Sequence, residues 1–212
     1  MDFTRVSAER YSFSKLDFLE GPKLRLAPLT LSDLVPLAKA LISKTTWFSK
    51  TRDLTTTEKF ADYFRPMISR REKGEAMTLV VRLRESDEIV AMSTYQFPSP
   101  GFLKIEIGFT WIAESWQRTF VNTEMKYLML KHAFEIMQAK RVEFSVHPEN
   151  PKSNAAMVRI GATLEGLLRK WRFLPGSGPG GIAFGDDGNR NMYSIVDDEW
   201  PRLRLNLEER IL

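Results

Sequence analysis

Residues 115–135 read SWQRTFVNTEMKYLMLKHAFE, a polar turn that continues into an apolar-striped run. The apolar residues of the run recur at helical spacing, which predicts a long amphipathic helix packed on a sheet. This helix would begin at about residues 120–123, shortly after the strand-like KIEIGFTWI at 104–112. Free amide groups and the helix dipole favour an anion at such a helix start, and Arg118 could add a charge-assisted hydrogen bond. The alternative is an ordinary solvated helix cap.

Length and composition indicate one ordinary globular domain. The chain has 212 residues, of which 43% are hydrophobic and 27% are charged. We predict a single domain over residues 21–212, preceded by an irregular arm over residues 1–20. No apolar run approaches the ~18 residues of a membrane span, and charges are scattered through the first residues where a signal peptide is apolar. A soluble cytoplasmic protein without a membrane partner is therefore expected.

The residue counts also exclude several kinds of chemistry. The sequence has no cysteine, which excludes disulfides, thiolate zinc sites and cysteine nucleophiles, and its two histidines cannot on their own build a metal site of the usual kind. We expect no metal cofactor. The formal charge of +4 comes from scattered basic residues, so it does not indicate a nucleic-acid partner. An anionic, phosphate-bearing cofactor suits this charge, and the oligomeric state stays open between monomer and homodimer.

Changes of period along the chain predict an α/β (α+β) fold with one mixed, mostly antiparallel sheet and helices on both faces. The seven predicted strands lie at about residues 22–30, 76–86, 88–98, 102–112, 140–148, 162–174 and 189–200. The predicted helices lie at about residues 31–44, 56–73, 120–138 and 151–161, with a short one at the C-terminus.

Two segments carry a resemblance to a known family. They are EIGFTWIAESWQRTFVNTEMKYLMLKHAFE at 106–135 and HPENPKSNAAMVRIGATLEG at 147–166. With the order of elements, they resemble the GNAT superfamily of acetyl-CoA-dependent N-acetyltransferases. More narrowly, they resemble the branch that includes the ribosomal-protein N-terminal acetyltransferases. The resemblance implies transfer of an acetyl group from acetyl-CoA to an amine acceptor, a protein N-terminus or a small molecule, by direct attack.

The same resemblance implies where the cofactor binds. In the family, a turn before the long helix holds the coenzyme A pyrophosphate with backbone amides. The fourth and fifth strands splay apart, so that the pantetheine arm pairs with a strand edge. The cofactor-binding residues implied here are Thr110, Trp111, Ile112, Gln117, Arg118, Thr119, Phe120, Val121, Asn122, Thr123, Asn150 and Ser153.

Three positions depart from the family pattern. The two small residues of the family turn correspond to Phe120 and Asn122, and glycine at the first would permit a positive φ and close approach to phosphate. A tyrosine that often protonates the leaving thiolate corresponds to Met157, which has no proton to donate. These departures keep a second function open: a catalytically weakened acyl-CoA-binding or protein-interaction module.

Two residues are the catalytic candidates. Glu106 alternates with Ile105 and Ile107 and so faces the opposite side of its strand, where the family often places a carboxylate base. The alternative for Glu106 is a surface glutamate. Ser153 corresponds to a serine that the ribosomal branch offers as an acid, and its alternative is a first-turn helix residue. Asn150 could contact the pantetheine arm or simply cap the following helix.

The position and spacing of the two histidines and of several aromatic residues favour structural roles over catalytic ones. His147, at a strand end before proline, is predicted to be structural, with a catalytic base as the alternative, and His132 among apolar residues is predicted to be a packing or surface residue. Helical spacing favours a core role over an acceptor-pocket role for a set of aromatic side chains: Trp47, Phe48, Phe60, Tyr63 and Phe64. The glycine-rich stretch at 175–188 is predicted to be a long loop that helps to shape the acceptor cleft.

Overall fold

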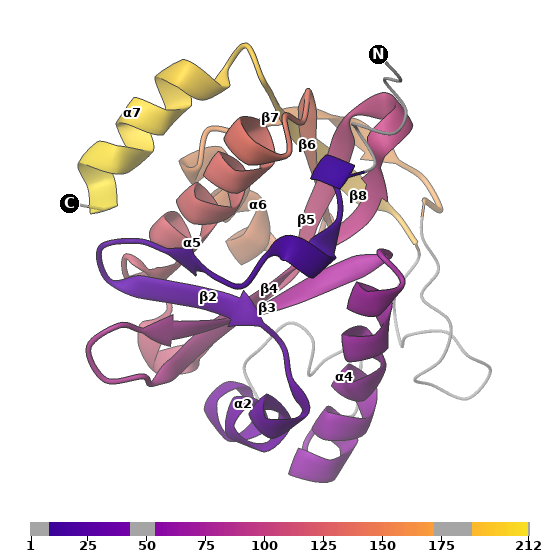
Figure 1. Cartoon of the computed structure of the whole chain (residues 1–212). Coiled ribbons are helices and arrows are strands. Elements are labelled where there is room, and N and C mark those ends of the chain that lie inside the picture. Colours follow the sequence, from indigo (N-terminus) through magenta and orange to yellow (C-terminus); the bar gives the residue numbers. More distant parts are fainter. Residues whose placement is uncertain (1–8, 43–53, 172–187, 212) are drawn as a thin grey trace.

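A computed structural model describes residues 9–42, 54–171 and 188–211, and within them eight strands form one mixed sheet (Figure 1). Their order across the sheet is β1-β2-β3-β4-β5-β6-β8-β7. The strands are β1 Leu19–Glu20, β2 Leu24–Pro28, β3 Ala76–Leu83, β4 Ile89–Ser99, β5 Lys104–Ile112, β6 Arg141–Val146, β7 Thr163–Leu168 and β8 Arg190–Val196. All neighbours are antiparallel except β5 and β6, which run parallel.

The prediction of seven strands is wrong by one. The additional strand is β1, whose two residues pair with Leu26 and Arg25 of β2 at the edge of the sheet. A two-residue strand is too short to show an alternation, so no periodic signal marks it in the sequence. The mixed and mostly antiparallel character of the sheet is confirmed.

Helices cover both faces of the sheet, as predicted (Figure 1). Helices α2 Leu34–Leu41 and α4 Thr57–Glu72 pack on one face, around a cluster that contains Phe60 and Phe64. Helix α5 Val121–Lys131, with a π-helical turn at His132–Ile136, packs on the other face together with α6 Pro151–Arg159 and α7 Trp200–Ile211. Short 3₁₀ turns lie at Phe13–Lys15, Leu31–Asp33, Pro100–Phe102 and Glu114–Trp116.

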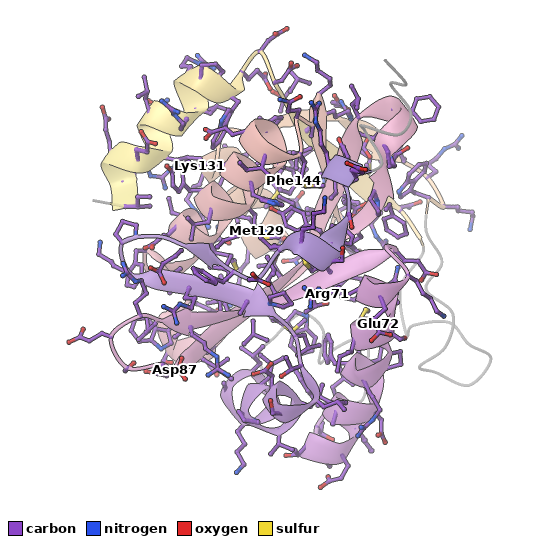
Figure 2. All side chains as sticks on the ribbon, in the orientation of Figure 1. Arg71, Glu72, Asp87, Met129, Lys131 and Phe144 are labelled. Carbon is purple, nitrogen blue, oxygen red and sulfur yellow. The ribbon has the colours of Figure 1, made fainter. Side chains whose placement is uncertain are left out.

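The described part of the predicted N-terminal arm, residues 9–20, packs against the rest of the domain. Tyr11 and Phe13 are buried in the cluster beneath α5. Arg71 of α4, labelled in Figure 2, donates hydrogen bonds to the carbonyl oxygens of Phe13 and Leu16 at 3.2 and 2.9 Å. These contacts bind the arm to the α5 side of the core and to α4.

Candidate active site

A cavity of about 800 Å³ lies where strands β5 and β6 cease to pair. Their ladder covers Lys104–Arg141, Ile105–Val142 and Glu106–Glu143, whereas β5 continues to Ile112 and β6 to Val146. The wall is formed by β5, β6, the turn before α5, the first turns of α6, and arginines from β8 and α7. Of the predicted site residues, those that line it are Glu106, Thr110, Trp111, Ile112, Gln117, Arg118, Thr119, Asn122, Thr123, Asn150 and Ser153.

The polar turn before α5 has the shape of an anion cradle. Arg118 has φ of 63°, so the chain makes its left-handed step there. Thr119 fixes the turn, because its hydroxyl donates to the Trp116 carbonyl at 2.7 Å and accepts the Val121 N–H at 3.3 Å. The N–H groups of Asn122 and Thr123 have no hydrogen-bond partner among the described residues, as expected for the first turn of a helix.

Phe120 and Val121 are the two predicted cofactor residues that do not line the cavity. Phe120 has φ of −64° and ψ of −21°, so its backbone needs no glycine. Its ring packs edge-on against Trp116 at 6.0 Å and lies 5.3 Å from the ammonium of Lys23. Val121 is fully buried in the core. The aromatic ring at the family's glycine position therefore points away from the cavity.

Glu106 is a buried carboxylate at the end of the β5–β6 ladder. The residue is only 4% exposed, so the surface alternative is wrong. Glu106 Oε1 accepts hydrogen bonds from Gln96 Nε2 at 3.3 Å and from Ser145 Oγ at 3.2 Å. Ile105 and Ile107 are buried on the opposite face, as the alternation predicts. These bonds hold the carboxylate at the cavity wall.

Helix α6 brings Asn150 and Ser153 to the same cavity. Asn150 caps the helix, because its Oδ1 accepts the Ser153 N–H at 3.1 Å. The capping role predicted as an alternative for Asn150 is thus confirmed, while its side chain still lines the cavity. Met157 lies on the next turn, buried, and forms part of the same wall.

Several lining residues were not predicted from the sequence. Lys126 of α5 is fully buried, and burial lowers its pKa to about 7. A basic residue inside an apolar helical stripe was a signal that could have identified it. Arg159 and Arg210 come together from α6 and α7, since Arg210 Nη1 donates to the Arg159 carbonyl at 2.6 Å. The sequence contains no signal for that contact between distant segments.

The two histidines and the aromatic side chains singled out in the sequence differ in their position relative to the cavity. His132 is outside the cavity wall, and burial lowers its pKa to about 4. His147 lines the cavity, but its Nδ1 accepts the backbone N–H of Glu149 at 3.2 Å. Phe60 and Phe64 are core residues that pack on Trp111 at 5.6 and 5.5 Å. Trp47, Phe48 and nearly all of the 175–188 stretch lie outside the described residues.

Two features are absent from residues 9–42, 54–171 and 188–211. These ranges contain no group of three or more His, Cys, Asp or Glu side chains placed to hold a metal ion. None of their helices has the length and apolar character needed to cross a membrane.

Comparison with known proteins identifies similar chains. The family described as acetyltransferase (GNAT) domain matches residues 23–163. The uncharacterized N-acetyltransferase YoaA of Bacillus subtilis (strain 168) is 23% identical over 116 residues, which span 55% of this chain and 60% of that protein's length. A crystal structure from T. thermophilus, described as a presumed acetyltransferase, is 27% identical with a TM-score of 0.77, covering 94% of this chain and 99% of that one. Mycobacterium smegmatis RimJ in complex with CoA-disulfide shares the fold, at 20% identity and a TM-score of 0.73, covering 92% and 95% of the two chains.

Proposed function

The chain belongs to the GNAT family of acetyltransferases, and from this premise we propose that it transfers an acetyl group from acetyl-CoA to a primary amine. The observation that carries the proposal is the cavity at the end of the β5–β6 ladder. A free helix start and a buried carboxylate both line this cavity. In the proposed reaction an amine attacks the thioester of a phosphate-bearing cofactor. This reaction needs a site that binds the phosphates and a group that accepts the amine proton, and the helix start and the carboxylate supply both in one cavity.

The cofactor would enter with its pyrophosphate at the turn of residues 117–123. There the amides of Asn122 and Thr123 would donate to phosphate oxygens, and Arg118 would add charge. The strands would splay beyond Glu106, so that the pantetheine arm pairs with the β5 edge at residues 108–112 in place of β6. Asn150 and Ser153 would contact the arm from the α6 side.

The transfer would proceed in one displacement. The acceptor nitrogen attacks the thioester carbonyl carbon, the carbon–nitrogen bond forms and the carbon–sulfur bond breaks. Glu106 would accept the amine proton, directly or through a water molecule, with its carboxylate held by Gln96 and Ser145. The leaving thiolate would take a proton from Ser153, which regains one from solvent. Protein N-termini and small-molecule amines are both candidate acceptors.

Met157 favours a second candidate function. It lines the cavity at the position where the family often has a proton-donating tyrosine, and a thioether cannot donate a proton. A chain that binds acyl-CoA without efficient turnover would act as a binding module. Phe120 does not support this alternative, because its ring lies away from the cavity.

Binding and turnover test the two functions in order. Calorimetry with acetyl-CoA should show saturable heat, and the ligand should raise the unfolding temperature. A thiol-release assay with peptides, polyamines and aminoglycosides as acceptors should then detect turnover. Absence of binding at millimolar acetyl-CoA would contradict both functions, and binding without any turnover would favour the binding module.

Two variants test the assigned roles. Glu106→Gln should lower kcat by about 100-fold or more, as expected for loss of a general base, with little change in acetyl-CoA affinity. Ser153→Ala should also lower kcat. The control is Glu143→Gln, a carboxylate on neighbouring β6 that pairs with Lys104 and Arg141 and does not line the cavity. Unchanged turnover in Glu106→Gln and Ser153→Ala would remove both assignments.

A further inference from the structure

Lys126 is a buried amine in the cavity wall that the proposed displacement does not use. It lies in α5, and the residue is 1% exposed. Its Nζ donates to Ser93 Oγ at 3.1 Å and to Thr110 Oγ1 at 2.7 Å. The ring of Phe144, labelled beside α5 in Figure 2, lies 5.9 Å from this nitrogen. The lysine therefore sits between the helix and three strands.

The two hydroxyls leave part of the ammonium unsatisfied. Ser93 Oγ donates to the Gly108 carbonyl at 3.4 Å, and the two hydroxyls bond each other at 2.9 Å. Both hydroxyls can therefore accept from the lysine. When the amine is protonated it has three N–H donors, and these bonds use two of them. Among the described residues, no carboxylate forms an ion pair with Lys126. A buried charge without a counter-ion is costly unless a ligand pairs with it.

The position of Lys126 makes the cofactor the natural partner. Side chains on a helix lean toward its N-terminus, so the lysine stem points toward the anion-cradle turn. Thr110 belongs to the stretch of β5 beyond its ladder with β6, where the pantetheine arm is proposed to pair. Lys126, Thr110 and the turn all line one cavity.

We propose that Lys126 is a cofactor-binding residue: an oxygen of bound coenzyme A accepts its third N–H, and the protein takes up a proton when the cofactor binds. This inference rests on the proposed function, because it requires that coenzyme A occupy the cavity. The acceptor oxygen is a carbonyl of the pantetheine arm or a phosphoryl oxygen of the diphosphate, two positions that the experiment below distinguishes.

The direction of the proton linkage follows from the free protein. Burial lowers the pKa of Lys126 to about 7, so at pH 8 the amine is mostly neutral. A hydrogen bond from the charged form to the ligand raises that pKa, so binding draws in a proton. Affinity should therefore fall as pH rises above 7, by up to about tenfold per pH unit. The other charged or titratable groups of the cavity are Glu106 and Arg118 on β5 and its turn, His147 after β6, Lys152 and Arg159 on α6, Arg190 on β8 and Arg210 on α7.

Calorimetry on the unmodified protein tests the inference. Coenzyme A is titrated at pH 8 in two buffers of different ionisation enthalpy, and the difference in heat gives the number of protons taken up. Uptake approaching one proton per coenzyme A is expected. Clear binding without uptake overturns the inference and leaves the proposed function intact, whereas absence of binding contradicts the proposed function itself.

Variants assign the proton to a residue. Lys126→Met should bind coenzyme A more weakly and lose the uptake, with thermal unfolding checked first. Lys131→Met removes an exposed lysine of the same helix (Figure 2), and this variant should still take up the proton. The variant His147→Gln should also still take up the proton. Uptake that persists in Lys126→Met, or is lost in His147→Gln alone, overturns the assignment. The wild-type proton count remains valid even if Lys126→Met does not fold.

Fragments of the cofactor locate the accepting oxygen. Uptake with adenosine 3′-phosphate 5′-diphosphate places the oxygen on the diphosphate. Uptake with coenzyme A but not with this nucleotide places it on the pantetheine arm. Either result supports the inference, and equal binding of coenzyme A at pH 7 and pH 9 overturns it.

Discussion

At the scale of single residues, Phe120 shows that a missing glycine need not mean a missing site. The left-handed step of the turn falls at Arg118, two residues earlier, while Phe120 has ordinary helical angles. The sequence showed that a glycine was replaced, but it could not show which residue had taken the positive φ. That depends on how Thr119 and Trp116 fix the turn.

Phe120→Gly should therefore lower stability without improving binding. The ring packs on Trp116 and beneath Lys23, so its removal should cost about 1–3 kcal/mol of unfolding free energy, less than for a fully buried ring. Acetyl-CoA affinity should stay the same or fall. Urea unfolding and calorimetry measure the two effects. Tighter binding in the variant would mean that the ring obstructs the phosphate after all.

The buried amine of Lys126 lowers the stability of the folded protein when it carries a positive charge. Its pKa is about 7 in the folded protein against 10.5 for a free lysine, so the unfolded chain binds the proton more tightly. The resulting loss of stability is complete at and below pH 7, and it is relieved as pH rises from 7 toward 10.5. The apolar residues around Lys126 on the long helix were a sign that it is buried, but the sequence could not show whether a counter-ion would lie beside it.

Lys126→Met should therefore be more stable than the parent at pH 7, by about 1–4 kcal/mol, since an apolar side chain of similar length replaces a buried charge. Ser93 and Thr110 can still bond each other. The advantage should shrink at pH 9, because the parent regains stability there. Urea unfolding at both pH values measures this. If the variant were less stable than the parent at pH 7, the hydrogen bonds of Lys126 to Ser93 and Thr110 would contribute more to stability than burial of the amine costs.

At the scale of elements, the sequence predicted the strongly patterned segments well. Glu106 illustrates why, because its alternation with Ile105 and Ile107 along the chain is enough to assign it to one face of β5. Strand β1 shows the limit, since its two residues join the sheet through pairing with β2 rather than through a pattern of their own. The end of α6 was predicted at about residue 161, but the packing of α7 against that end was not.

Gly161→Ala should be unusually costly for a small substitution. Gly161 has φ of 83°, and a Cβ there would lie 2.4 Å from Leu203 Cδ2 of α7. Gly74 at the end of α4 has φ of 70° with no atom within 4 Å of the added Cβ, so Gly74→Ala measures the backbone cost alone, about 1–2 kcal/mol. Gly161→Ala should exceed this in urea unfolding. Equal losses of unfolding free energy in the two variants would mean that Leu203 of α7 does not pack tightly against the end of α6.

At the scale of the whole molecule, the cavity is assembled from segments far apart in the chain. Helix α7 is held against α5, because the Tyr127 hydroxyl donates to Glu208 at 2.7 Å and Trp200 stacks on Phe134 at 5.4 Å. This packing brings Arg210 to the cavity rim beside α6. The family match ends at residue 163, so this contribution lies beyond the matched residues. Local patterns could predict α7 but not its contact with the cavity.

Arg210→Ala should weaken acetyl-CoA binding about two- to fivefold, with kcat unchanged, because an exposed charge at the rim contributes about 0.5–1 kcal/mol to binding an anion. The effect should shrink as salt screens the charge. Calorimetry at low and high ionic strength measures it. Arg202→Ala is the matched control, since Arg202 is exposed on the same helix and does not line the cavity. Equal weakening by both variants would indicate only the net charge of α7, whereas loss in Arg210→Ala alone would make the C-terminal helix part of the cofactor site.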